Sequence, residues 1–237
     1  MARSAVAAGI RTIVATPHVS SRYDNTATTI AAAAAALRQR LAAGGVELEL
    51  LAGAEVALTK VAELEDSQLA ALRLGGSQWL LLEPPFSPVA GALEGVVASL
   101  QGAGHRILLA HPERCPAIQR HPDVLERLVL QGVLSSVTAG SLTGQFGSTV
   151  RALAMHLIEE GLVHNVASDA HDNTSRPPEI ARALQRAGLG ELTQWFCEDV
   201  PAAILAGDEH IPVRPDIASG SHGRRPSARR WLGLRRG

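Results

Sequence analysis

The chain has 237 residues, a formal net charge of −1 with neutral histidines, 46% hydrophobic residues and 19% charged residues. This length and balance fit a single soluble α/β domain. The near-zero charge and the aromatic content of 3% argue against a nucleic-acid-binding surface and against attraction to an anionic membrane. Cys115 and Cys197 have no metal or redox spacing, so we expect reduced thiols and a cytoplasmic location.

Short apolar runs bounded by turn residues recur along the chain. Their length and their content of Leu and β-branched residues are typical of buried parallel strands. No run reaches the roughly 20 residues that a membrane-spanning helix needs. The predicted strands cover residues 12–15, 48–52, 79–82, 107–110, 133–137 and 162–167.

Longer segments with helical character separate these runs. The first is rich in alanine, with Asn25 or Thr26 as its N-cap and Gly44-Gly45 as its stop. Alternation of strands and helices predicts an α/β fold with a parallel sheet over residues 1–211. Residues 212–237 are rich in arginine and have little to bury, so we expect a disordered tail. The predicted helices cover residues 26–43, 89–101, 122–131, 148–160 and 178–187.

A His, Asp or Glu follows nearly every predicted strand. In a parallel barrel the carboxyl ends of all strands meet at one rim, so these residues should converge there. Imidazoles and carboxylates packed together in this way need a cation, and a mixed N/O set favours Zn, Mn or Fe over Mg or Ca. More than four ligands indicates a multinuclear site. The candidate ligands are His18, Glu55, Glu83, His111, Asp169 and His171.

The remaining histidines have positions that favour structural roles. They precede strands, lie within helices or fall near the tail, and we expect none of them to bind metal. They are His105, His121, His156, His164, His210 and His222.

Several segments together resemble the PHP-family tyrosine phosphatases found with capsule and exopolysaccharide gene clusters in bacteria. The resemblance extends from about Ala2 to Leu205. No single segment is diagnostic, but the set is specific. The segments are residues 9–18 (GIRTIVATPH), 53–55 (GAE), 110–114 (AHPER), 139–147 (AGSLTGQFG), 161–171 (GLVHNVASDAH) and 176–178 (RPP).

This resemblance implies a distorted (β/α)7 barrel of TIM-like type with a multinuclear metal cluster, commonly Mn²⁺, at its rim. The six candidate ligands match the family's metal ligands, and Glu83 matches its bridging carboxylate. Arg114 matches the arginine that holds the phosphate, a role suited to its planar fork of donors. A salt bridge from Arg114 to Glu113 or another neighbour is the plainer alternative. Arg22 is a weaker candidate for meeting the phosphotyrosine.

The implied reaction is attack of a metal-bound hydroxide on the phosphorus of phosphotyrosine. The implied substrate is a phosphotyrosine protein, a bacterial tyrosine kinase of polysaccharide synthesis or export. Cys115 follows Arg114 but lacks the Cys-x5-Arg loop of the cysteine phosphatases, so we expect it to be a bystander.

The sequence departs from the family pattern in two places. The family opens with a strand that ends in Asp-x-His-x-His, and this sequence contains no His-x-His motif. We expect that Met1 is an internal start of a longer protein, with true truncation as the alternative. Thr138 stands where the family usually has Asn.

Two other functions remain open at this point. One is a phosphoesterase of the same superfamily that acts on a small metabolite, because metal ligands do not reveal the substrate. The other is a barrel that binds phosphotyrosine or a kinase without hydrolysis, which the absent motif favours.

Overall fold

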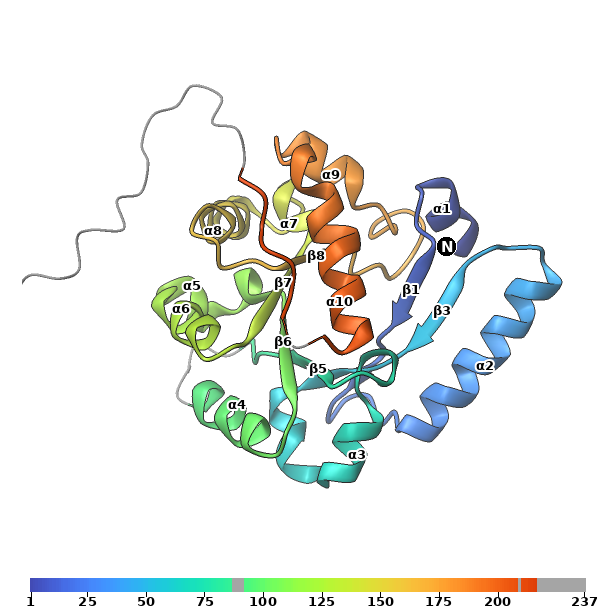
Figure 1. Cartoon of the computed structure of the whole chain (residues 1–237), viewed down its shortest axis with the longest axis horizontal. Helices are drawn as coiled ribbons and strands as arrows, with labels where there is room; N and C mark the ends of the chain where they lie inside the picture. Colours follow the sequence, from blue (N-terminus) through green and yellow to red (C-terminus); the bar gives the residue numbers. More distant parts are fainter. Residues whose placement is uncertain (87–91, 209, 217–237) are drawn as a thin grey trace, which may run out of the picture.

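The computed structural model describes residues 1–86, 92–208 and 210–216 (Figure 1). The first residues of the helix predicted at 89–101 and most of the predicted tail lie outside these ranges. The disorder expected of residues 217–237 therefore stays a prediction.

Every strand pairing in the described part of the chain is parallel, which confirms the predicted α/β class. A two-stranded sheet pairs β1 with β3, and a six-stranded sheet has the order β2-β4-β5-β6-β7-β8. Each predicted run contains a strand. The bounds are β1 Thr12–Ala15, β2 His18–Val19, β3 Glu49–Ala52, β4 Glu55–Ala57, β5 Trp79–Glu83, β6 Arg106–Ala110, β7 Leu134–Thr138 and β8 Asn165–Ala167.

Two short strands, β2 and β4, were not predicted. They continue β1 and β3 after brief interruptions. Two backbone hydrogen bonds connect the two segments across the interruptions: Gly53 N donates to Ala15 O at 3.0 Å, and Glu55 N donates to Pro17 O at 3.2 Å. Pro17 has no N–H to donate to a ladder. At Gly53, a Cβ atom would lie 2.9 Å from Leu74 Cδ2 and 3.1 Å from Leu74 Cα, so a larger residue would crowd Leu74. The interruption places His18 and Glu55 as opposite partners at the start of a new sheet.

Helices surround the strands (Figure 1). The Thr26 hydroxyl accepts a hydrogen bond from Thr29 N, which confirms the predicted N-cap of α2. The predicted helices are α2 Ala27–Ala43, α4 Leu93–Gly102, α6 Asp123–Leu130, α8 Ser148–Glu159 and α9 Ala181–Arg186. The helices that were not predicted are α1 Ala2–Ala7, α3 Asp66–Ala71, α5 Pro116–Arg120, α7 Ala139–Leu142 and α10 Val200–Ala206.

Single helical turns occupy several connections. Segments this short lack the periodicity of longer helices, so the sequence pattern does not predict them. They are the 3₁₀ turns Leu58–Glu63, Leu74–Gly76, Pro112–Arg114 and Gly190–Leu192, and the π turn Trp195–Asp199.

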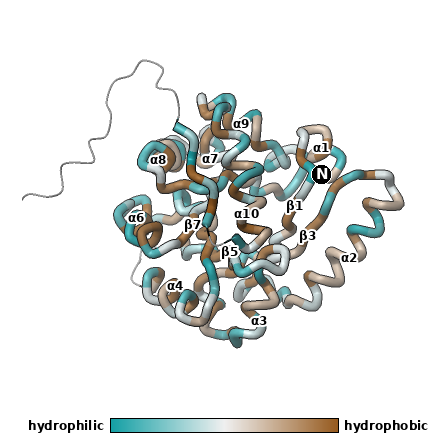
Figure 2. The backbone as a smooth tube through the Cα atoms, in the orientation of Figure 1, coloured by the Kyte–Doolittle hydropathy of each residue, from teal (hydrophilic) through white to brown (hydrophobic). Residues whose placement is uncertain are grey.

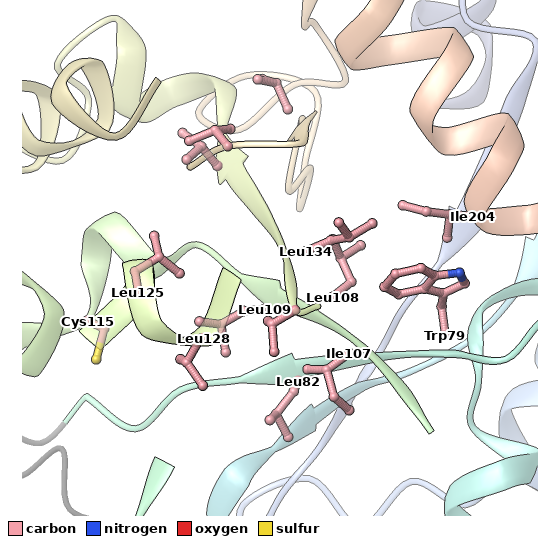
Figure 3. Close-up of a cluster of buried hydrophobic side chains, with 14 of the residues drawn as sticks. Trp79, Leu82, Ile107, Leu108, Leu109, Cys115, Leu125, Leu128, Leu134 and Ile204 are labelled. Atoms are coloured by element: carbon pink, nitrogen blue, oxygen red, sulfur yellow. The ribbon is translucent and has the colours of Figure 1, made fainter. Parts of the chain in front are cut away.

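The core lies between the strands and the helices (Figure 3). Leu82, Ile107 and Leu109 from the sheet are fully buried, and Leu125 and Leu128 of α6 are fully buried beside them. Hydrophobic residues follow one another along strands such as β3 (Figure 2). A continuous core of this kind holds the strands in register and so fixes the positions of the residues at their ends.

The first residues of the predicted tail contact the domain. Trp195 Nε1 donates to Pro212 O at 2.9 Å, and Arg214 Nη1 donates to Ile158 O at 2.6 Å. Residues 212–216 therefore run against the domain. Of the helices in the described ranges, none combines the length and apolar content needed to cross a bilayer.

His164 predicts a pH dependence of folding. Burial, with a smaller contribution from Arg214, lowers the pKa of His164 from 6.5 to about 4, and its Nδ1 accepts from Ser135 N at 3.1 Å. The pKa of His164 is lower in the folded protein than in the unfolded chain, so neutral His164 favours folding. This stabilisation is complete above pH 6.5 and is lost as the pH falls through about 4. A shift of this size corresponds to about 3 kcal/mol.

The test is the free energy of unfolding by urea at pH 7 and pH 4. His164→Asn keeps an acceptor for Ser135 N but cannot be protonated, so its loss of stability between the two pH values should be smaller by up to about 3 kcal/mol. His156→Asn, at an exposed position of α8, serves as the control. An unchanged pH dependence in His164→Asn would contradict the assignment.

Candidate metal centre

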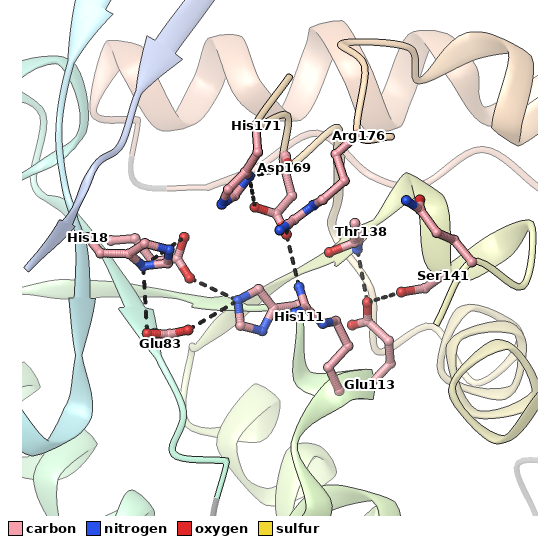
Figure 4. Close-up of polar contacts among 12 residues, drawn as sticks. His18, Glu83, His111, Glu113, Thr138, Ser141, Asp169, His171 and Arg176 are labelled. Atoms are coloured by element: carbon pink, nitrogen blue, oxygen red, sulfur yellow. Dashed lines mark hydrogen bonds and ion pairs between the residues drawn. The ribbon is translucent and has the colours of Figure 1, made fainter. Parts of the chain in front are cut away.

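His18 and Glu55 begin β2 and β4, Glu83 ends β5, and the three side chains converge. Figure 4 shows His18 and Glu83 facing one another. Each offers one ligand atom, and these atoms all lie within 4.8 Å of one another. His18 Nδ1 is 4.0 Å from Glu55 Oε2 and 3.8 Å from Glu83 Oε2. Parallel register produces this arrangement, because His18 lies opposite Glu55 and Glu83 lies opposite Ala57.

His111 joins this group from the end of β6. Its Nε2 is 2.8 Å from Glu55 Oε1 and 3.8 Å from Glu83 Oε1, and only 6% of its side chain is exposed. Its backbone has a φ of 32°, a left-handed conformation that is strained for a residue other than glycine. Strain of this kind is often found at functional sites.

The two glutamates differ in their electrostatics. Burial would raise the pKa of Glu55, but the hydrogen bond from His111 and nearby positive charges outweigh it, so this pKa is lowered. Burial raises the pKa of Glu83, and the negative charge of Glu55 raises it further. For His111, burial lowers the pKa but the bond to Glu55 outweighs it, so the net shift is upward.

The donor set fits a metal ion. Two carboxylates that repel one another, with two imidazoles beside them, form a site whose charge a divalent cation would balance. His111 Nδ1 is buried without a hydrogen-bond partner, so protein contacts alone leave part of this cluster unsatisfied. Mixed imidazole and carboxylate ligands suit a transition metal. His18, Glu55 and Glu83 thus form a candidate metal site, with His111 as a fourth neighbour.

The two remaining predicted ligands lie beside this group. The His171 ring centroid is 6.0 Å from that of His18, and His171 Nδ1 donates to Asp169 O at 2.9 Å. This bond leaves Nε2 as the nitrogen able to bind a cation. Asp169 has a strained φ of 49°, and its carboxylate pairs with two arginines. Metal binding by Asp169 and His171 stays a prediction.

Arg114 and Arg176 share the Asp169 carboxylate. Arg114 Nη1 donates to Asp169 Oδ2 at 2.9 Å, and Arg176 Nη2 donates to the same oxygen. The Arg114 guanidinium lies 4.5 Å from the centre of the Phe146 ring, and that of Arg176 lies 5.8 Å from it. Arg114 is thus paired with Asp169, and the hydrogen bonds of Glu113 go elsewhere.

Glu113 anchors the turn that carries His111 and Arg114. It is fully buried, and its Oε1 accepts from Ser141 Oγ at 2.6 Å and from Thr138 N at 3.0 Å. Burial raises its pKa, and these two hydrogen bonds oppose the shift. The contacts tie the Pro112–Arg114 turn to the end of β7. Because Thr138 contributes its backbone N–H, this bond needs no particular side chain at that position.

Asp172 shapes the loop that carries Arg176. Its carboxylate accepts from the Ser175 hydroxyl and from the backbone N–H groups of Thr174, Ser175 and Arg176. These bonds, with the Ser175 hydroxyl first, hold the pKa of Asp172 well below its usual value. The loop is thereby folded back so that Arg176 reaches Asp169.

One cleft contains most of these side chains. The predicted residues that line it are His18, Arg22, Glu83, His111, Arg114, Asp169 and His171. Glu55 lies beneath, bonded to His111. Four residues for which the sequence analysis predicts no role line the same cleft: Ser20, Tyr23, Phe86 and Arg176. Arg176 could have been found, because it stands in one of the segments that carry the family resemblance. Tyr23 and Phe86 lie in loops after strands, where no spacing rule marks them.

Metal binding should reverse the effect of a Glu83→Gln substitution on stability. Without metal the variant should be at least as stable as the wild type, because it removes repulsion between Glu83 and Glu55. With Mn²⁺ at 100 times its dissociation constant the wild type should gain about 2.7 kcal/mol. The variant should gain much less, because it lacks one anionic ligand.

Thermal unfolding with and without Mn²⁺ measures both effects, and calorimetric titration should show an affinity at least about tenfold lower for Glu83→Gln. Glu47→Gln, at an exposed position before β3, is the matched control. Equal stabilisation of wild type and Glu83→Gln by Mn²⁺ would rule out this site.

The chain matches the family model described as capsular polysaccharide synthesis, CpsB/CapC, over residues 1–197. It is 38% identical over 219 residues to the tyrosine-protein phosphatase YwqE of Bacillus subtilis (strain 168), covering 91% of this chain and 85% of that protein. It is 25% identical over 183 residues to the tyrosine-protein phosphatase CpsB of Streptococcus pneumoniae, covering 74% of each.

A solved structure extends the match to three dimensions. It comes from work described as crystal structures of YwqE from Bacillus subtilis and CpsB from Streptococcus pneumoniae, unique metal-dependent tyrosine phosphatases. It superposes with a TM-score of 0.76 at 35% identity, covering 88% of this chain and 85% of that one. Sequence and fold agree, and the chain belongs to the CpsB/CapC family of capsular polysaccharide synthesis.

Proposed function

We propose that this chain is a metal-dependent protein-tyrosine phosphatase. The observation that carries the proposal is the meeting of a His/Glu metal site with two arginines in one cleft. The first group suits a divalent cation and the second suits a phosphoryl group. The relatives named above are tyrosine phosphatases, and the solved relative is described as metal-dependent.

His18, Glu55, Glu83 and His111 would hold the metal, and Asp169 and His171 would complete a multinuclear site. Mn²⁺ is the first choice, with Fe and Zn as alternatives that the same donors accept. A divalent cation bound there supplies Lewis acidity toward the phosphoryl group and lowers the pKa of coordinated water.

We also propose that the parallel strands belong to a distorted (β/α)7 barrel.

Arg114 and Arg176 bind and orient the phosphoryl oxygens in this proposal. Each guanidinium offers several N–H donors, and the shared bond to Asp169 uses only one from each. Tyrosine leaves as a phenolate with a pKa of about 10, so its departure needs less help from a proton donor than that of an aliphatic alcohol. Orientation and charge neutralisation are therefore the main tasks of the side chains.

The proposed substrate is a phosphorylated tyrosine in a bacterial kinase of polysaccharide synthesis or export, reached in the cytoplasm. Its support is the family, whose description names capsular polysaccharide synthesis. The cleft is partly open to solvent and lined by residues of several loops, as access for a phosphorylated side chain of another protein requires.

Hydrolysis of a phosphotyrosine peptide with Mn²⁺ tests the function. Wild-type protein should release phosphate, and chelation of the metal should abolish release. Arg114→Lys keeps the charge but loses the fork of donors, so kcat/KM should fall about 10- to 100-fold. Arg120→Lys, at an exposed position of α5, should leave the rate unchanged.

Two comparisons separate the alternatives. Faster turnover of small phosphate monoesters than of phosphotyrosine peptides would favour a metabolite phosphoesterase. Peptide binding without turnover would favour a binding module. To distinguish a binding module from a phosphatase that needs a further metal motif, the assay includes a second protein with an added N-terminal Asp-x-His-x-His segment. Absence of turnover in both proteins, folded and loaded with metal, would contradict the proposed function.

A further inference from the structure

Three of the chain's four tyrosine and phenylalanine side chains lie at the cleft, whereas the tryptophans among the described residues, Trp79 and Trp195, are buried in the core. The sequence has one tyrosine and three phenylalanines. Tyr23 and Phe86 line the cleft and Phe146 lies against its arginines, whereas Phe196 is buried in the core. A chain this poor in aromatic side chains has therefore placed three of them around one site.

Two of these rings are open to solvent. Tyr23 is 44% exposed and Phe86 is 56% exposed. Exposed aromatic rings at the edge of a polar cleft are well placed to contact a bound ligand. Phe146 is less exposed, because it packs beneath the two guanidinium groups. Tyr23 and Phe86 are thus the rings that a ligand can reach.

Each exposed ring is held in place by an imidazole of the candidate metal site. Tyr23 stacks on His18 with ring centroids 5.5 Å apart and an angle of 21° between the planes. Phe86 stacks on His111 at 5.8 Å and 25°. The Phe86 ring also lies 5.6 Å from the Arg114 guanidinium. Both rings are therefore fixed close to the groups that bind a phosphoryl group and its metal.

An aryl phosphate presents a flat ring one oxygen atom away from phosphorus. When its phosphoryl group reaches Arg114, its ring must lie within contact range of nearby side chains. The alcohol part of an alkyl phosphate offers no flat face at that point. Aromatic rings attract other rings in offset or edge-to-face arrangements. The cleft thus combines an anion-binding part with an aromatic part next to it.

We propose that Phe86 and Tyr23 form an aryl-binding subsite that selects aryl phosphates such as phosphotyrosine over alkyl phosphates, an inference that rests on the proposed function. Phe86 makes the larger contribution, because it lies near Arg114 as well as His111. Tyr23 covers the opposite imidazole, that of His18. The two residues determine specificity and take no part in proton transfer or metal binding.

The first experiment measures binding by calorimetry with benzylphosphonate and butylphosphonate, in the presence of Mn²⁺. These compounds cannot be hydrolysed, so the measurement does not depend on turnover. Phe86→Leu keeps an apolar side chain but removes the ring. The preference for benzylphosphonate should fall about tenfold in this variant, and further when Tyr23→Leu is added. Phe86→Tyr should retain the preference.

Three checks make the result decisive. Leu130→Ala, at an 80% exposed position of α6, is the control for the general effect of removing an exposed apolar side chain. Mn²⁺ affinity is measured for each variant, and it should stay at the wild-type value because neither ring supplies a ligand atom. The ratio of kcat/KM for phenyl phosphate to kcat/KM for butyl phosphate is measured for each variant and divided by the same ratio for the wild type. This division removes the intrinsic difference between the two leaving groups, because that difference is the same for both proteins.

If Phe86→Leu lowers the affinity for the aryl and the alkyl phosphonate equally, or lowers neither, the proposed aryl subsite is wrong. A loss seen only with a peptide, and absent with benzylphosphonate, would also overturn it, because the rings would then contact flanking residues. Selective binding of benzylphosphonate that disappears in Phe86→Leu, without hydrolysis of any phosphotyrosine substrate, would support the subsite and contradict the proposed function.

Discussion

The site depends on a buried contact between Glu55 and His111, whose side chains are 7% and 6% exposed. It joins the start of β4 to the end of β6, with β5 between them. Removing one partner would leave a buried polar group unpaired, a change that costs several kcal/mol in comparable pairs. The contact exists only in the observed register, because a shift of β4 by one residue would turn Glu55 to the other face of the sheet.

The backbone around this contact is strained where the site requires it. His111 and Asp169 are the two residues other than glycine with positive φ in the described part of the chain. Each such conformation costs about 1–2 kcal/mol. Hydrogen bonds offset the strain: His111 N donates to Ser136 O at 2.7 Å, and two arginines hold the Asp169 carboxylate. These bonds hold the two strained turns, and with them the side chains of the site, in position.

The sequence predicted the strands and the candidate metal ligands better than the loop residues that line the cleft. Buried strands are continuous apolar runs, so the predicted strands and the convergence of His18, Glu55, Glu83 and His111 could be read directly from the chain. The split of β1 from β2 was missed, because its cause is a proline without a donor and a glycine packed on Leu74. Arg176, Tyr23 and Phe86 come together through tertiary contacts of loops, which carry no periodic signal.

In the proposed function, the position of Asp169 between two arginines would explain how an anion-binding site can exist beside three carboxylates. Asp169 pairs with Arg114 and Arg176, and Phe146 lies against both guanidinium groups. Each arginine carries about 2 kcal/mol of rotamer entropy, most of which is already lost before a ligand arrives. A phosphoryl group with a charge near −2 brings more acceptor oxygens than one carboxylate. It can therefore engage the free donors of both arginines while Asp169 keeps them in place.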